Sequence, residues 1–282
     1  MIVRLFCPKC AYEASKHFDG FAEIEVPVPV SRLSDNGQYE VHCGKGHISA
    51  VVLDNVKFEL LFEMGLNAMV DGYPREAVSS FASALERFYE FYWRVAMHHF
   101  GMPKEQIEKA WKPLSKLSER QIGAYSTVVT LLTKEAPSLL NPNKHVPFRN
   151  KVIHNGYVPT EEEAIAFGDT VKQLIDGDLD KLRQIAADSL VSIYQELSPR
   201  YYEETPEGDD DSDIMGCVNI LTAIDVRNPP KSDGKRFGSV NDQFQRIVED
   251  RQPIRMQMLS EEEMKKRFPE KDCKKILRTG SS

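Results

Sequence analysis

The sequence has few cysteines and no long apolar run. Five of its 282 residues are cysteine, too few for the disulfide framework of a small secreted scaffold. No uninterrupted apolar stretch approaches the roughly 18 residues that a membrane span needs. The first residues, MIVRLFCPKC, lack the basic start, apolar stretch and small-residue cleavage site of a secretory signal. We therefore expect a cytoplasmic protein with no membrane part.

The sequence also lacks an excess of basic residues. Lys and Arg number 36 against 43 Asp and Glu, a net charge of −7, which argues against a protein that coats nucleic acid by bulk charge. The stretch 203–213, EETPEGDDDSD, holds seven acidic residues and no basic one. Subtracting these seven from 43 leaves 36 acidic residues, equal to the basic ones. Such a self-repelling run is typical of a solvated linker, so the net charge does not exclude a small basic site within a neutral fold.

Composition excludes a wholly disordered or collagen-like protein, and the strand and helix patterns along the chain predict an α+β fold that is mostly α. The start is rich in Val, Ile, Phe and Tyr and favours short strands and turns. The end favours a small α/β module or an appendage on the helical body, with a strand in MGCVNILTAIDV and a helix in VNDQFQRIVEDR. The expected regions are a small strand-rich domain at 1–55, a helical bundle at 57–198, an acidic linker at 199–213 and a C-terminal module at 214–282.

Apolar spacing predicts a long helix that begins near Pro74 and ends before Gly101. Apolar residues recur every three or four positions from Val78 to Ala96, and Pro74 suits a first helical turn because its missing N–H costs nothing there. The helix carries an aromatic run for which we favour a core and dimer-interface role over base stacking: Phe81, Phe88, Tyr89, Phe91, Tyr92 and Trp93.

Later boundaries are marked by capping residues. Helices are expected at 104–111 and 119–134. Asn155 and Gly156 indicate a helix end, since both tolerate the left-handed conformation. Thr160 followed by Glu163 is a capping box that starts the next helix, and a further helix is expected at 179–197.

Three cysteines and a histidine have the spacing of a metal site. Cys7 and Cys10 lie two residues apart, and His42-Cys43-Gly-Lys-Gly-His47 follows about thirty residues later. Two such turns supply the four N/S ligands of a closed tetrahedral zinc site. We prefer His47 to His42 as the fourth ligand, because His42 beside Cys43 would point away on an extended strand. The alternative is three buried cysteines without metal. The segment resembles a zinc ribbon, with a structural zinc bound by Cys7, Cys10, Cys43 and His47.

A second cluster is Arg149-Asn150-Lys151-Val152-Ile153-His154. Arginine binds phosphate through a planar fork of donors, and histidine titrates near neutral pH. On RNA the 2′-hydroxyl is an internal nucleophile, so a protein need only move protons and stabilise charge on the phosphate. Taken alone, an Arg and a His five residues apart are more often a surface pair or a core histidine.

The stretch RNKVIHNGYVPTEEEA, following a helix that ends ALERFYEFYWRV, resembles a HEPN domain, the higher eukaryotes and prokaryotes nucleotide-binding family. The resemblance covers roughly 57–198. It implies an up-and-down bundle of four or five helices, and a homodimer in which two Arg–His motifs form one composite site. Arg149 would bind the scissile phosphate, His154 would be the general acid or base, and Asn150 would hold the histidine or a phosphate oxygen.

Three further residues have two interpretations each. Lys151 adds positive potential for RNA or is a solvated lysine. Tyr157 lines the RNA-binding cleft or is a packing tyrosine. Glu86 pairs with Arg149 or is an ordinary surface carboxylate.

The resemblance implies a metal-independent endoribonuclease, a toxin of a toxin–antitoxin pair or an antiviral defence effector. Its expected partners are RNA, a second copy of the chain, and an antitoxin or nucleotidyltransferase. The alternatives are a non-catalytic nucleotide- or RNA-binding scaffold, and a zinc-ribbon nucleic-acid adaptor with a helical dimerisation body.

Overall fold

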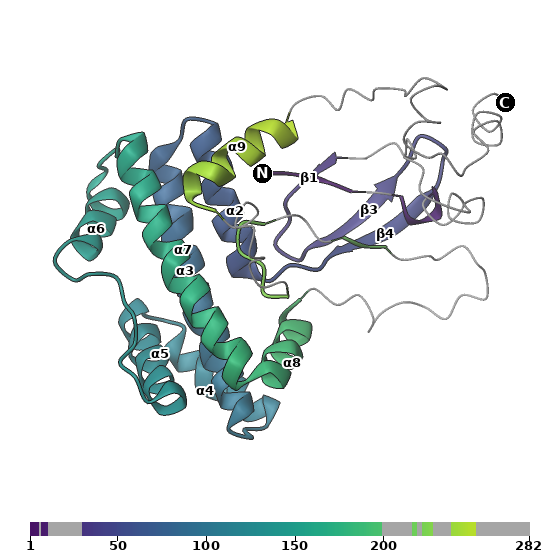
Figure 1. The fold of residues 1–282 in the computed structure, drawn as a ribbon. Coiled ribbons are helices and arrows are strands. Elements are labelled where there is room, and N and C mark those ends of the chain that lie inside the picture. Colours follow the sequence, from purple (N-terminus) through teal and green to yellow (C-terminus); the bar gives the residue numbers. More distant parts are fainter. Residues whose placement is uncertain (6, 11–29, 199–215, 219–221, 228–237, 252–282) are drawn as a thin grey trace, which may run out of the picture. The chain divides into compact units, whose positions relative to one another are not determined.

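The computed structural model describes residues 1–5, 7–10, 30–198, 216–218, 222–227 and 238–251. The chain comprises two compact units, residues 1–247 and 248–282. The first unit combines a small amount of sheet with a large helical body (Figure 1). The predicted class, α+β and mostly α, is confirmed.

The strands form two small sheets. β1 (Ile2–Arg4) pairs antiparallel with β2 (Val30–Arg32), and β3 (Gln38–His42) pairs antiparallel with β4 (Ile48–Leu53). β5 (Gly216–Val218) adds to β4 in parallel, although more than 160 residues separate them in sequence. Alternate residues point inward, as the two-residue period of a strand requires. They form a small apolar core of Val3, Leu5, Tyr39, Val41, Val51 and Leu53.

The helical body is built around one long helix, α3 (Pro74–His99). The helices packed on α3 are α2 (Lys57–Val70), α4 (Lys104–Leu114), α5 (Ser118–Thr133), α6 (His145–Asn155), α7 (Glu161–Ile185) and α8 (Ala187–Leu197). Every member of the aromatic run on α3 is buried, with at most 6% of its surface exposed. The run therefore belongs to the core and is not available for stacking bases.

The capping residues fix α6 and α7 as predicted. Gly156 ends α6 in the left-handed conformation at φ +70°. The Glu163 N–H donates to Thr160 Oγ1 at 3.2 Å, which completes the capping box. The expected separate helix at 179–197 was wrong: α7 continues to Ile185, and the break falls at Ala186.

Two described pieces of the C-terminal tail, residues 222–227 and 238–247, contact the helical body as an appendage, whereas β5 belongs to the sheet. The Val226 N–H donates to Glu59 Oε1 at 2.7 Å, and the Ala223 N–H donates to Glu63 Oε2 at 3.2 Å. Arg246, on α9 (Val240–Arg251), also donates to Glu63, at 2.7 Å. Two buried carboxylates of α2 thus hold segments that come more than 150 residues later.

Candidate functional site

Three cysteines and one histidine meet beside the small sheets. Cys7 and Cys10 follow β1, while Cys43 and His47 flank the turn between β3 and β4. Their four ligand atoms all lie within 4.8 Å of one another, and the three thiols are buried. Gly46 closes the turn at φ +83°, donating its N–H to the Cys43 carbonyl at 2.9 Å. The grouping predicted from the spacing is therefore present, and it can bind a metal ion.

Two of three distances between the ligand atoms match tetrahedral coordination, and the Cys10–His47 distance is slightly shorter. Cys10 Sγ lies 3.8 Å from Cys43 Sγ and 3.3 Å from His47 Nδ1, and Cys7 Sγ lies 3.7 Å from His47 Nδ1. Zn–S bonds of about 2.3 Å and Zn–N bonds of about 2.0–2.1 Å place tetrahedral ligands roughly 3.5–3.8 Å apart. A disulfide would bring two sulfurs to about 2.05 Å, so the cysteines are free thiols.

His42 lies outside this group. Its Nε2 contacts Glu40 Oε1 at 2.5 Å on the exposed side of β3. The alternation of a strand places neighbours 42 and 43 on opposite faces, which is the reason for preferring His47 in the sequence.

Burial and hydrogen bonds act differently on the thiols. Burial, with help from the neighbouring Cys7 thiol, raises the pKa of Cys10 to about 12. Burial also acts to raise the pKa of Cys43, but hydrogen bonds from the backbone of Lys45 and His47 outweigh it and lower that pKa. A cation between the sulfurs would favour the thiolate form of all three.

The short helix α6 presents the Arg–His motif. Val152 is fully buried, and the Phe148 ring packs against Phe167 of α7 at 5.6 Å. Arg149 lies at the edge of this inner face, where its Nη2 donates to Glu86 Oε1 on α3 at 2.5 Å. Ser118, at the start of α5, donates to the same oxygen at 3.0 Å. Of the two interpretations of Glu86, pairing with Arg149 is the one observed.

Asn150 and His154 lie one helical turn apart on the exposed face of α6. Among the described residues, neither side chain has a hydrogen-bond partner. Five residues of helix rotate His154 by about 140° from Arg149. Within one chain, the helix therefore brings Asn150 and His154 together and points Arg149 elsewhere.

Lys151 and Tyr157 contact each other. The Lys151 Nζ lies 3.4 Å from the centre of the Tyr157 ring, a cation–π contact. The Tyr157 hydroxyl donates to Glu163 at 2.9 Å, and this bond raises the pKa of the tyrosine. Tyr157 is thus fixed to the capping box of α7, and Lys151 remains exposed.

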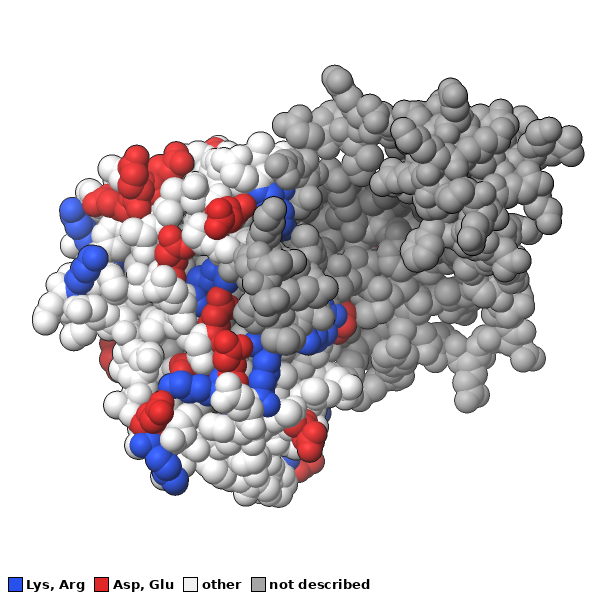
Figure 2. Space-filling view, viewed as in Figure 1, with Lys and Arg blue, Asp and Glu red and all other residues white. Residues whose placement is uncertain are grey.

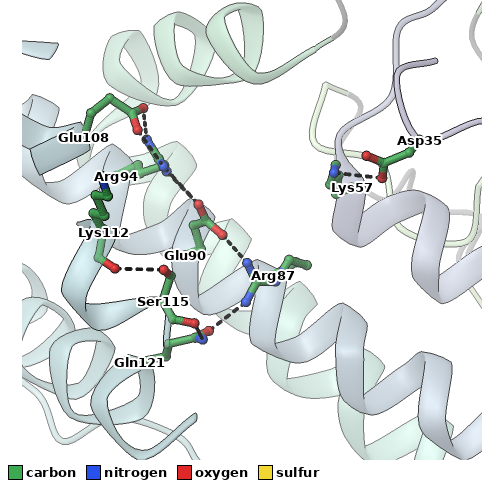
Figure 3. A network of polar contacts seen from close by, with 9 residues as sticks. All are labelled: Asp35, Lys57, Arg87, Glu90, Arg94, Glu108, Lys112, Ser115 and Gln121. Atoms are coloured by element: carbon green, nitrogen blue, oxygen red, sulfur yellow. Dashed lines mark hydrogen bonds and ion pairs between the residues drawn. The ribbon is translucent and has the colours of Figure 1, made fainter. Parts of the chain in front are cut away.

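Sequence reasoning missed a polar network along α3 (Figure 3). Arg87 donates to Glu90 at 2.5 Å and to Gln121 of α5 at 2.9 Å. The buried Arg94 donates to Glu90 at 3.0 Å and to Glu108 of α4 at 2.5 Å. The available signal was three charged residues at three- and four-residue spacing within an otherwise aromatic helix.

On the face drawn in Figure 2, acidic and basic side chains are interspersed over the helical body. Within the described part of the chain, each helix is too short or too polar to cross a bilayer. Comparisons with protein-family models, curated proteins and solved structures find no match to this chain.

Proposed function

We propose that the protein is an endoribonuclease whose site is formed by Arg149, Asn150 and His154. The observation that carries the proposal is the arrangement on α6. An arginine is paired with Glu86, whose carboxylate also accepts from Ser118, and an exposed histidine lies beside an amide on the solvent face. The resemblance to HEPN ribonucleases assigns the same three positions.

The chemistry needs only these groups and the RNA itself. His154 takes the proton from the 2′-hydroxyl or returns one to the departing 5′-oxygen. Arg149 stabilises the charge on the phosphate oxygens as the 2′-oxygen attacks, and Asn150 orients the histidine or a phosphate oxygen. The products are a 2′,3′-cyclic phosphate and a 5′-hydroxyl. DNA, which lacks the nucleophile, is not cleaved.

A second copy of the chain supplies the rest of the site in this proposal. Arg149 and His154 point about 140° apart on one α6, so one phosphate cannot easily contact both from a single helix. Two α6 helices facing each other would place the arginine of one opposite the histidine of the other. Lys151, exposed beside them, would add positive potential along the RNA.

The metal group is proposed to be a structural zinc site. All four tetrahedral positions are supplied by Cys7, Cys10, Cys43 and His47, which leaves no position for a substrate. Zinc would fix the fold of a segment with a small apolar core. The proposed cell role is that of a cytoplasmic toxin or antiviral defence effector, restrained by an antitoxin or a nucleotidyltransferase partner.

The test is cleavage of RNA by the purified protein. Wild type should give 2′,3′-cyclic phosphate ends, while His154→Ala and Arg149→Ala should lose at least about a hundredfold in rate. His99→Ala is the matched control because His99 is an exposed histidine on another helix. Equal cleavage by wild type and His154→Ala, or cleavage of an all-2′-deoxy substrate, would refute the proposal.

One observation favours a second function, a binding or scaffold module. Arg149 is already paired with a carboxylate, as expected for a residue that holds helices together. Expression in cells separates the two functions. If the protein is a ribonuclease toxin, its expression arrests growth, and His154→Ala relieves the arrest. If it is a binding module, cells tolerate both the wild type and the His154→Ala variant.

A further inference from the structure

A cavity of about 310 Å³ lies between the start of α2, the middle of α3 and the end of α8. It is separate from the metal group and from the motif on α6. Its lining residues are Val56, Lys57, Phe58, Arg87, Glu90, Phe91 and Leu197. The volume lies at the lower end of the range of small-molecule sites, about 300–1,000 Å³.

The floor of this cavity is apolar and closely packed. Val56, Phe58 and Phe91 are each at most 2% exposed. The rings of Phe58 and Phe91 lie 5.2 Å apart in a tilted arrangement, and Leu197 closes one side from α8. Such a floor suits a flat or branched apolar group, because burying it removes apolar surface from water.

The rim carries two cations and one carboxylate. Arg87 uses two of its five N–H donors on Glu90 and Gln121. The other three have no acceptor among the described residues. Glu90 accepts from both Arg87 and the buried Arg94, so its charge is shared between two guanidinium groups.

Lys57 is available for a ligand at little cost. Its partner is Asp35, and the two side chains are 61% and 94% exposed. An exposed pair of this kind contributes about 0–1 kcal/mol to stability, so an anion entering the cavity can displace Asp35. Figure 3 shows the Lys57–Asp35 pair at the upper right of the view, with Arg87 and Glu90 nearer the centre.

We propose that this cavity binds a small amphipathic anion, a compound with an aromatic or branched apolar body and one carboxylate or phosphate. The body would lie on Phe58 and Phe91, and the anionic head would contact Lys57 and the unused donors of Arg87. The site does not depend on the ribonuclease proposal, because it shares no residue with the Arg149–His154 motif.

The test is calorimetric titration of the full chain with 1-naphthyl phosphate, 1-naphthoate and inorganic phosphate. Wild type should bind one of the two naphthyl anions at least about tenfold more tightly than inorganic phosphate, and the tighter one identifies the head group. Lys57→Ala should weaken that binding about tenfold or more. Leu197→Trp, which fills the cavity, should abolish it.

Lys109→Ala is the control, because it removes an exposed lysine from α4 and should leave the affinity unchanged. Thermal unfolding midpoints establish that each variant is folded. If Leu197→Trp does not fold, Lys57→Ala alone tests the proposal. Absence of binding at millimolar concentrations of both naphthyl anions overturns the proposal. So does equal affinity of wild type and Lys57→Ala, or an equal loss of affinity in Lys57→Ala and Lys109→Ala.

Discussion

Arg149 of α6 and Glu86 of α3 are joined by a hydrogen-bonded ion pair of 2.5 Å, and both side chains are mostly shielded from water, at 20% and 26% exposed. Ser118 of α5 donates to the same carboxylate oxygen. Side chains from three helices, α3, α5 and α6, therefore meet at the Glu86 carboxylate, beside the arginine of the proposed site. The pair fixes where the guanidinium lies, and the carboxylate also competes with any phosphate for it.

Changing Glu86 to Gln should separate these two effects. The amide keeps a partner for Ser118 but loses the charge, so the free energy of unfolding should fall by about 1–2 kcal/mol. Affinity for RNA should rise, because Arg149 no longer shares its charge with a carboxylate. Urea unfolding and RNA titration measure the two quantities, with the exposed Glu76→Gln on the same helix as control. Weaker RNA binding would instead mean that Glu86 positions Arg149.

Metal content should depend on His47 and not on His42. We expect about one zinc ion per chain in the wild type by elemental analysis, and loss of that ion in His47→Ala and Cys43→Ser. His42→Ala is the matched control, because it removes an exposed imidazole only one residue from Cys43. A chelator should lower the thermal midpoint of wild type and of His42→Ala, but should not change that of His47→Ala. Equal zinc in His42→Ala and His47→Ala would contradict the four-ligand site.

Local features of the fold could be predicted because their causes are local. A glycine at φ +70° after α6, a capping box at Thr160 and a two-turn ligand pattern each depend on a few neighbouring residues. The helix break at Ala186 could not be predicted from the sequence, because Gly177 in the run IDGDLD suggests an earlier helix end. The helix continues past Gly177 because Ile175, Leu179 and Leu182 keep one apolar face against the core.

The place of the tail and the geometry of the candidate sites depend on tertiary contacts. Glu59 and Glu63 lie one turn apart in the apolar helix KFELLFEMGL, and that spacing is a signal of buried polar partners. The sequence does not say that the partners are Val226 and Ala223, because the pairing depends on how a distant segment returns. Nor does the sequence say that Arg87 of α3 and Lys57 of α2 line the same cavity, because this too depends on how the helices pack.

Stability should depend on pH through Glu59. Burial raises the pKa of Glu59 to about 7, in spite of hydrogen bonds from the Val226 N–H and the Asn55 amide. The folded state thus binds a proton more tightly than the unfolded one, where the pKa is about 4.5. This contribution is complete below pH 4.5 and is lost as the pH rises through 7, by about 3 kcal/mol in total.

The measurement is urea unfolding of wild type and Glu59→Gln between pH 4 and 8. The stability of wild type relative to the variant should fall across this window. Glu105→Gln, at an exposed position in α4, is the control. A difference between wild type and Glu59→Gln that stays constant with pH would show that Glu59 does not change its protonation there.

Gly65 and Gly123 should respond in opposite directions to substitution by alanine, because only Gly65 lies against a buried ring. A Cβ at Gly65 of α2 would lie 2.5 Å from Cε1 of Phe81, and a Cβ at Gly168 of α7 would lie 2.8 Å from Cε2 of the same ring. Phe81 is fully buried between these glycines, so its ring cannot move away. Gly65→Ala should therefore lower the free energy of unfolding by about 1–3 kcal/mol, although alanine favours the helix by about 1 kcal/mol.

Gly123→Ala on α5 is the matched substitution, because a Cβ there meets nothing within 4 Å. It should raise the free energy of unfolding by about 0.5–1 kcal/mol, since alanine favours the helical backbone over glycine and its methyl group meets no steric clash here. Adding Phe81→Leu to Gly65→Ala should cost less than the sum of the two single changes, because the smaller side chain relieves the contact with the new methyl group. Urea unfolding of the four variants measures this, and strictly additive losses would show that Phe81 does not limit the space at Gly65.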